Sequence, residues 1–245
     1  MKCFLLADNR PDLLATLEPI LKHWGYRVVS ATNAQQATAL LAESSLSLLI
    51  FGQKIFADKS FALKKAIQEQ ITSSQLPLII LKQNSDHPLP VEPNAILDVP
   101  VDIFALFAFI QRYVEKHPRQ NLRLQLRLPG MYRVGNDEYT LSDVLSLSTK
   151  GLFFKTPMRL RKGDNVTVVF PLYGHCKELE IESKVLYVIQ PEPSNNFMQG
   201  FGVGFQGLSA AEEANLEKFI EEHFLREVSS SQAGVGDFSE NQLKR

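Results

Sequence analysis

The chain has 245 residues, of which 44% are hydrophobic and 22% charged, and its formal net charge is −1 at pH 7. This composition is typical of a soluble globular protein with two domains of ordinary size. The near-zero net charge argues against general DNA binding and against binding to a membrane surface, because both require a strongly basic face.

Cys3 and Cys176 are the only cysteines, and two isolated thiols indicate a reducing compartment. Asp8 and Arg10 end the apolar N-terminus too early for a signal peptide. No run approaches the ~20 apolar residues that a membrane helix needs. We therefore expect a cytoplasmic protein with neither DNA nor a membrane among its partners.

Residues 1–117 alternate between short apolar runs and segments of helical periodicity. Such alternation predicts an α/β doubly wound parallel sheet with helices on both faces. Asn9 and a Thr32–Gln35 capping box are the expected starts of the first two helices. The predicted strands are 4–7, 27–30, 46–51, 78–81 and 95–99, and the last two predicted helices are 61–71 and 101–117.

This pattern resembles a response-regulator receiver domain, in which an aspartate at the end of the third strand takes phosphate. Two acids after the first strand, a Thr or Ser after the fourth and a Lys before a late proline assist it. Here Asn9 follows Asp8 in the acidic pair, and the three other positions hold Gly52, Lys82 and Val99. Magnesium prefers several carboxylate oxygens, and phosphoryl transfer needs an acceptor. The resemblance therefore implies a pseudo-receiver without phosphate. We expect Asp8 to be a helix-start carboxylate on a solvated turn, in preference to the alternative of a metal ligand.

The segment from Lys82 to Val99 is too short for a loop and a full helix. The helix predicted at 101–117 is apolar on more than one side, and such a helix normally packs on two surfaces. One surface is its own sheet. The other is a second copy of the chain, giving a homodimer, or the following domain. The alternative, equally supported, is that the extra aromatics fill a local core left open by the missing helix.

Residues 118–228 carry many short strands separated by turns, which predicts an antiparallel β-barrel. A Ser209–Glu212 capping box predicts a C-terminal helix that closes or flanks it. Residues 229–245 are polar and predict a disordered tail. The predicted strands are 122–128, 139–147, 152–155, 165–172, 178–188 and 197–205.

Arginines gather where this second half begins, and no acidic residue lies between Glu115 and Asp137. Arg119 and Arg123 are four residues apart, and Arg127 and Arg133 follow. Arginine pairs bidentately with phosphate, reads guanine O6 and N7, and stacks on base planes. We therefore expect an anion or nucleotide site here, with Arg127 and Arg133 interpreted as charges of a solvated strand edge. Arg127 shares a strand face with Arg123, which keeps a ligand contact open for it.

Two motifs, Arg119-x-x-x-Arg123 and Ser146-x-Ser148-x-x-Gly151, precede a Gly-Val-Gly-Phe strand at 202–205 and the closing helix. Over about 119–226 the chain resembles the PilZ domain, the bacterial receptor for cyclic di-GMP. The resemblance implies a cyclic di-GMP site formed by Arg119, Arg123, Ser146, Ser148 and Gly151.

One position departs from the family, which has Asp or Asn where this chain has Ser146, so that an acceptor meets guanine N–H groups. Serine reaches less far and carries no charge, and losing a charge-assisted bond costs roughly 1.5–3 kcal/mol. Asp143 is expected on the opposite face of the strand, three residues away, and therefore no substitute.

No nucleophile motif, phosphate-cradling glycine loop or metal spacing of histidines is found, so we expect neither an enzyme nor a bound cofactor or metal. The first functional hypothesis is a bacterial cyclic di-GMP effector that signals to an unidentified protein partner. The second is an adaptor in which both domains act only through protein contacts, and Ser146 favours it. A phosphorylation-driven regulator is opposed by Gly52.

Overall fold

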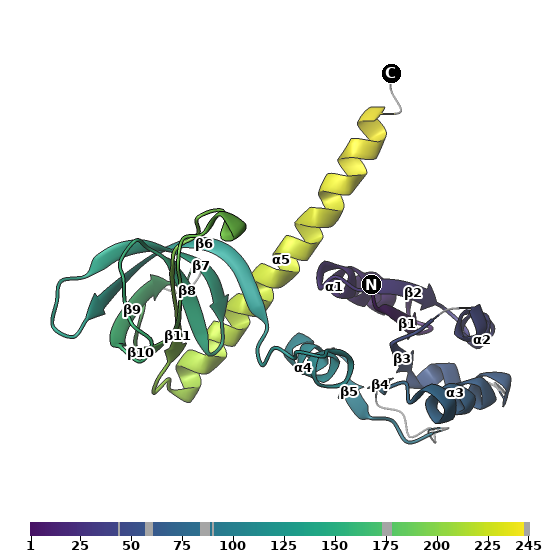
Figure 1. Cartoon of the computed structure of the whole chain (residues 1–245). Coiled ribbons are helices and arrows are strands. Elements are labelled where there is room, and N and C mark those ends of the chain that lie inside the picture. Colours follow the sequence, from purple (N-terminus) through teal and green to yellow (C-terminus); the bar gives the residue numbers. More distant parts are fainter. Residues whose placement is uncertain (44, 57–60, 84–88, 90, 173–177, 243–245) are drawn as a thin grey trace. The chain divides into compact units, whose positions relative to one another are not determined.

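A computed structural model describes the chain except residues 44, 57–60, 84–88, 90, 173–177 and 243–245 (Figure 1). Cys176 therefore lies outside the described residues, whereas Cys3 is a buried free thiol. The chain forms two compact units, one of Met1–Gln120 with Val228–Arg245 and one of Asn121–Glu227. Among the described residues, no helix is both long and apolar enough to cross a membrane.

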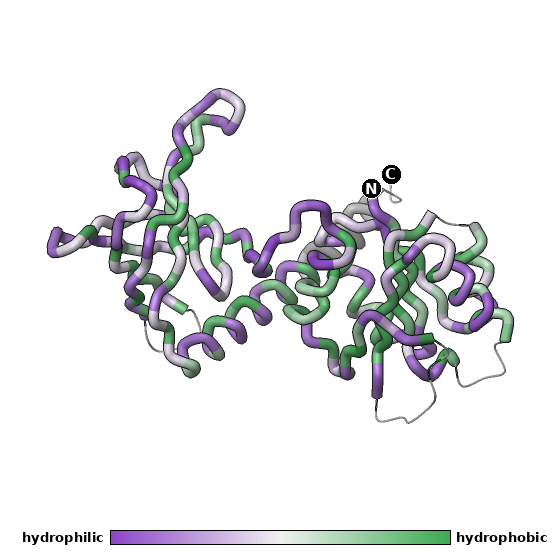
Figure 2. Tube along the Cα trace, turned by 60° about the horizontal axis from the view of Figure 1, so that its bottom comes forward, coloured by the Kyte–Doolittle hydropathy of each residue, from purple (hydrophilic) through white to green (hydrophobic). Residues whose placement is uncertain are grey.

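The N-terminal unit is built on a five-stranded parallel sheet of order β2-β1-β3-β4-β5. This is the doubly wound order shared by flavodoxin-like and receiver folds, and it confirms the predicted α/β class. Figure 2 shows the apolar sheet as the green centre of this unit. The strands are β1 (Cys3–Ala7), β2 (Arg27–Ala31), β3 (Leu48–Gly52), β4 (Leu78–Lys82) and β5 (Ala95–Asp98).

Helices cover both faces of this sheet and enclose two separate apolar clusters. One cluster joins α1 and α4 to one face, through residues such as Leu17 and Ile110. The other joins α2 and α3 to the opposite face, through residues such as Leu41 and Leu63. The helical elements are α1 (Pro11–His23), α2 (Ala34–Glu43), η1 (Gln53–Phe56), α3 (Phe61–Ser74) and α4 (Ile103–Val114).

The starts of the first two helices differ from the predicted ones. The N–H of Gln36 donates to Oδ1 of Asn33, and Thr32 donates to Oε1 of Gln36, so the capping pair lies one residue later than predicted. Before α1, the N–H of Arg10 donates to Oδ1 of Asp8, and Asn9 does not cap the helix. The described residues between β4 and β5 contain no helix, in keeping with the short segment.

The extra aromatic residues of α4 find at least one partner inside the N-terminal unit. Phe107 meets the edge of Trp24, with ring centroids 5.2 Å apart, while Leu106, Phe109 and Ile110 belong to the cluster on the sheet. Local packing therefore accounts for part of the second apolar side of α4. The homodimer through residues 101–117 remains a prediction.

The second unit is a closed barrel of order β10-β11-β8-β7-β6-β9 with antiparallel pairing, as predicted. Its core is aromatic, because Tyr132, Phe154 and Phe201 are fully buried with ring centroids 5.0 to 5.6 Å apart. The strands are β6 (Arg123–Val134), β7 (Thr140–Ser148), β8 (Gly151–Lys155), β9 (Asn165–Pro171), β10 (Glu178–Ile189) and β11 (Gly200–Phe205).

The last helix, α5 (Ala210–Gln242), begins at the predicted capping box. Ser209 N–H and hydroxyl both donate to Oε2 of Glu212, and Glu212 N–H donates to the Ser209 oxygen. The helix continues through most of the segment predicted to be disordered. Its composition is poor for a helix, but a helix that is already nucleated gains one hydrogen bond for each residue it adds.

Candidate functional site

Four of the five predicted site residues come together on the outer face of the barrel. Arg123 at the start of β6 pairs with Ser148 on β7, and Ser148 pairs with Gly151 on β8. Because paired residues on adjacent strands point to the same face, these three form one row across the sheet. The Ser148 hydroxyl donates to the Gly151 carbonyl at 3.0 Å, and Ser148 is largely buried.

Gly151 is needed here because another backbone approaches it closely. A β-carbon at this position would lie 2.0 Å from the carbonyl oxygen of Val203 on β11. The close approach at Gly151 is therefore one of protein backbone within the barrel wall. It fixes the position of the β7–β8 turn, whose Lys150 also pairs with Glu213 of α5 at 2.6 Å.

A second row contains Ser146, the fourth of these residues. Ser146 pairs with Gln125 on β6 and with Phe153 on β8, which in turn pairs with Gly202 on β11. The ring of Tyr187 lies over Gly202 and stacks on Phe153, with centroids 6.2 Å apart and planes 12° apart. The row therefore ends in a partly exposed aromatic surface, a feature that sequence reasoning missed.

The arginines of the barrel fall into two groups. No described carboxylate lies within ion-pair distance of Arg123, so its guanidinium is free to bind an external anion. Arg127 pairs with Asp143 at 2.8 Å, while Arg133 lies 3.7 Å from Glu180 and over the Tyr139 ring. The last two arginines thus have charged or aromatic neighbours within the barrel.

Arg119, the fifth predicted residue, belongs to the N-terminal unit. Its backbone N–H donates to Oε1 of Gln111 on α4 at 2.7 Å, and its side chain is exposed. The end of α4 is itself tied to the residue before β1, since Lys2 Nζ donates to the Val114 carbonyl and to Glu115, the latter at 2.7 Å. The segment that follows α4 is therefore anchored to the N-terminal unit as far as Arg119.

The prediction that Asp143 lies on the face of β7 opposite to Ser146 is wrong. Asp143 pairs with Lys155 and Ser146 pairs with Phe153, and the register shifts between Val144 and Ser146. Phe153 and Lys155 are two residues apart and share a face, so Asp143 shares the face of Ser146. The burial of both Val144 and Leu147, three residues apart, agrees with this bulge. That apolar spacing was the signal in the sequence.

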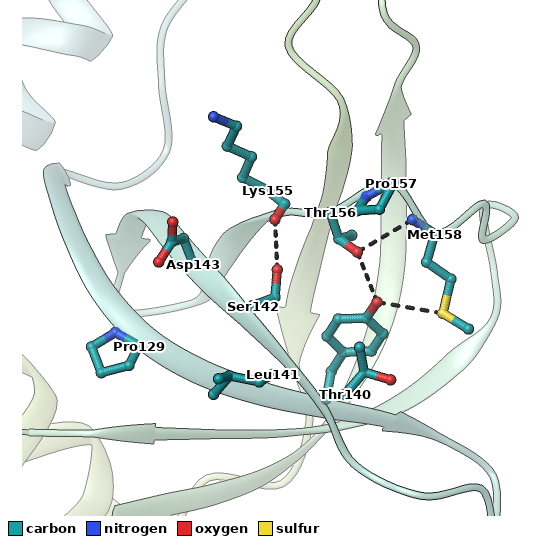
Figure 3. Close-up of a pocket in the computed structure, with 10 residues that line it drawn as sticks. Pro129, Thr140, Leu141, Ser142, Asp143, Lys155, Thr156, Pro157 and Met158 are labelled. Carbon is teal, nitrogen blue, oxygen red and sulfur yellow. Dashed lines mark hydrogen bonds between the residues drawn. The ribbon is translucent and has the colours of Figure 1, made fainter.

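A cavity of about 640 Å³ adjoins this face (Figure 3). Asp143 and Lys155 contribute charged groups to it, and Tyr132 donates to or accepts from Thr156 at 2.9 Å within it. The Arg127–Asp143 pair lies at its margin. The cavity is lined by Pro129, Tyr132, Thr140, Leu141, Ser142, Asp143, Lys155, Thr156, Pro157 and Met158.

The barrel and its motifs correspond to a known family. Residues 116–222 match the PilZ domain family. The chain contains a PilZ domain. No curated protein matches the chain.

Several solved structures are similar in fold to one half of the chain. The inhibitor of motility MotI/DgrA from Bacillus subtilis is 15% identical with a TM-score of 0.40, and the match covers 44% of this chain and 52% of MotI. The PilZ domain of YcgR from Escherichia coli, solved with c-di-GMP, is 13% identical with a TM-score of 0.37, covering 47% and 97%. The chain therefore spans about half the length of MotI.

A solved receiver domain is similar to the N-terminal half of the chain. The receiver domain of the sensor histidine kinase PA1611 from Pseudomonas aeruginosa, solved with magnesium, is 20% identical with a TM-score of 0.41. The match covers 46% of this chain and 97% of that domain.

The receiver-like unit places Asp8 differently from the sequence-based expectation. Asp8 is fully buried, so it does not lie on a solvated turn. Arg10 holds both of its oxygens, with Nε 2.8 Å from Oδ1 and Nη2 2.6 Å from Oδ2, and donates from Nη1 to Gln83. The hydrogen bonds to Asp8 raise the pKa of the Arg10 guanidinium. Within the described part of the chain, no cluster of His, Cys, Asp and Glu could hold a metal ion.

Proposed function

We propose that the protein is a cyclic di-GMP-binding effector that signals through protein contacts, with a receiver-like unit that takes no phosphoryl group. The observation that carries the proposal is the row of Arg123, Ser148 and Gly151 across β6, β7 and β8. It joins both sequence motifs of the PilZ domain on one face, with the Arg123 guanidinium, which pairs with no described carboxylate, at its end.

The proposed roles follow from the chemistry of each side chain. Arg123 and Arg119 offer planar guanidinium groups that pair bidentately with phosphate or with guanine O6 and N7. Ser148 and Ser146 offer hydroxyl oxygens as acceptors for N–H groups of the ligand. Gly151 fixes the turn that presents them, because its lack of a side chain lets the Val203 backbone approach closely.

The signal is proposed to arise at the junction between the two units. Arg119 belongs to the N-terminal unit and Arg123 to the barrel, with the boundary between Gln120 and Asn121. A ligand bound by both arginines restricts this junction, and the conformations that remain differ in the surface offered to a partner. The partner is either another protein or a second copy bound through residues 101–117.

The receiver-like unit lacks the chemistry of phosphoryl transfer, in this proposal, because its acidic residue is already occupied. Both carboxylate oxygens of Asp8 accept hydrogen bonds from Arg10, and Gly52 at the acceptor position has no side chain. The guanidinium supplies the positive charge beside Asp8 that a divalent cation would otherwise supply. Incubation with acetyl phosphate should leave the mass of the intact protein unchanged, and a stable acyl-phosphate adduct would contradict this part of the proposal.

Titration calorimetry with cyclic di-GMP tests the ligand. We expect saturable binding to the wild type and a loss of about ten- to a hundredfold in affinity for Arg123→Ala, because charge-assisted hydrogen bonds to the ligand disappear. Arg133→Ala is the matched control and should bind like the wild type. Absence of heat at high micromolar ligand overturns the effector function, and unchanged binding by Arg123→Ala overturns the site.

A second candidate function is an adaptor that binds no nucleotide and acts through protein contacts alone. Ser146 favours it, because this hydroxyl replaces the charged or amide acceptor that the resemblance implies. The same calorimetry separates the two candidates, since the adaptor gives no heat with cyclic di-GMP while the protein remains folded.

A further inference from the structure

We infer that the cavity lined by Asp143 and Lys155 is a guanine subsite, in which these two residues recognise the Watson–Crick edge of one base. This inference rests on the proposed function and names how its ligand is selected. It assigns the acceptor role to Asp143, which lies on the same strand as Ser146 and is brought to the same face by the β-bulge between them.

The position of the two charged residues follows from the strand register. Asp143 and Lys155 are paired neighbours on β7 and β8, and Lys155 is two residues beyond Phe153, the partner of Ser146. Two residues along a strand span roughly 7 Å, about the reach of one nucleotide base beyond the Ser146 row. A ligand held at Arg123 and Ser148 therefore extends along the same outer face into the cavity.

Guanine matches a carboxylate beside an ammonium group. Its Watson–Crick edge presents the O6 acceptor next to the N1–H and N2–H donors. The oxygen Oδ1 of an ionised Asp143 carboxylate has two lone pairs that can accept from these two N–H groups, and an ammonium group donates to a carbonyl oxygen. Adenine presents an amino donor in place of O6 and has no N2 amino group, so the Asp143–Lys155 pair disfavours it.

Both groups have unused hydrogen-bonding capacity. Arg127 Nε and Nη2 bind only Oδ2 of Asp143, at 3.0 and 2.8 Å, and no described donor lies within hydrogen-bond distance of Oδ1. No described carboxylate forms an ion pair with Lys155, which lines the cavity. The exposed guanidinium of Arg127 fixes the orientation of the Asp143 carboxylate from outside.

The remaining walls suit the two faces of a purine. Leu141 and Met158 are exposed apolar side chains at the cavity, 74% and 44% accessible, and Pro129 and Pro157 also line it. Met158 is held in place, since the Tyr132 hydroxyl donates to its sulfur at 3.4 Å (Figure 3). Apolar walls with a few convergent polar groups are the usual construction of a small-molecule site.

Calorimetry with two ligands tests the subsite: cyclic di-GMP and its cyclic di-inosine analogue, which lacks only the N2 amino groups. We expect the wild type to bind cyclic di-GMP about tenfold or more tightly than the analogue. Asp143→Ala should lose about ten- to a hundredfold for cyclic di-GMP and bind the two ligands equally. Asp143→Asn, which preserves the side-chain shape, should fall between. Asp137→Ala, in the β6–β7 turn, is the matched control and should keep wild-type behaviour.

The outcomes separate the subsite from the function it rests on. Wild-type protein that binds neither ligand overturns the proposed function and the subsite with it. Wild-type binding together with an Asp143→Ala variant that still prefers cyclic di-GMP overturns the subsite alone. Loss of that preference in Asp143→Ala, with folding unchanged by circular dichroism, supports both.

Discussion

The Asp8 carboxylate occupies the space that a side chain at Gly52 would need. A β-carbon at Gly52 would lie 2.0 Å from Oδ2 of Asp8, and Arg10 prevents the carboxylate from moving away. The lack of an acceptor at the end of β3 and the buried ion pair after β1 are thus one structural feature. A side chain at position 52 and the Asp8–Arg10 pair exclude each other.

We predict that Gly52→Ala lowers the free energy of unfolding of the N-terminal unit by about 1–3 kcal/mol, because an added methyl group must displace a buried carboxylate. Trp24, the only tryptophan, lies in this unit, so its fluorescence during urea denaturation reports the change. The same substitution in an Asp8→Ala background should cost less, with a coupling of about 0.5–3 kcal/mol. An equal cost in both backgrounds would show that the two residues do not compete for space.

We predict that acid destabilises the N-terminal unit partly through Glu115. The hydrogen bond from Lys2 lowers the pKa of Glu115 most strongly, burial opposes it, and the Tyr26 hydroxyl lowers the pKa further. A depressed pKa in the folded state means that the stabilisation is present above the unfolded value, near 4.5, and disappears as pH falls through the folded value. The urea concentration at the midpoint of unfolding, followed by Trp24 fluorescence, should therefore fall in acid. In Glu115→Gln this midpoint should fall less.

The control for this prediction is Glu69→Gln, which removes a carboxylate of an exposed pair. Glu69 and Lys65 are 3.8 Å apart with both side chains 67% exposed, so solvent screens their interaction. A Glu69→Gln variant with the same flattened pH dependence as Glu115→Gln would argue against a specific role for Glu115.

We predict that Gly151→Ala disrupts the proposed site through the barrel wall. The new methyl group would meet the Val203 carbonyl, so β8 and β11 must separate at this point. Amide hydrogen exchange should accelerate in 151–155 and 200–205, and cyclic di-GMP binding should fall with it. Ser148→Ala removes a hydroxyl without adding volume and should leave the exchange rates of β11 unchanged. Slow exchange in Gly151→Ala would contradict the steric argument.

The elements of both units could be predicted from the sequence because apolar periodicity determines them. The five apolar runs of the first half became β1 to β5, and a turn that contains Gly135 separates β6 from β7. Contacts between side chains of different elements were harder to predict from the sequence. The burial of Asp8 depends on Arg10 reaching back over a turn, and no local pattern announces that contact.

The count of residues along β7 predicted the wrong face for Asp143, and the reason is physical. A strand alternates faces with period two only while its register is unbroken, and β7 contains a bulge beside β8. The error concerned Asp143, and the cluster of Arg123, Ser146, Ser148 and Gly151 was unaffected because these four lie on one side of the bulge. The shared face of these four residues could therefore be read from the sequence, while the face of Asp143 could not.

We predict that Ser146→Asp strengthens cyclic di-GMP binding little in the wild type and much more in Asp143→Ala. In the wild type, a carboxylate at 146 would duplicate the acceptor that Asp143 provides and add a like charge roughly 7 Å away. In Asp143→Ala it would restore a charge-assisted acceptor and recover about ten- to a hundredfold in affinity. Calorimetry on the four variants of this cycle measures the coupling. Equal gains in both backgrounds would show that positions 143 and 146 act on the ligand independently.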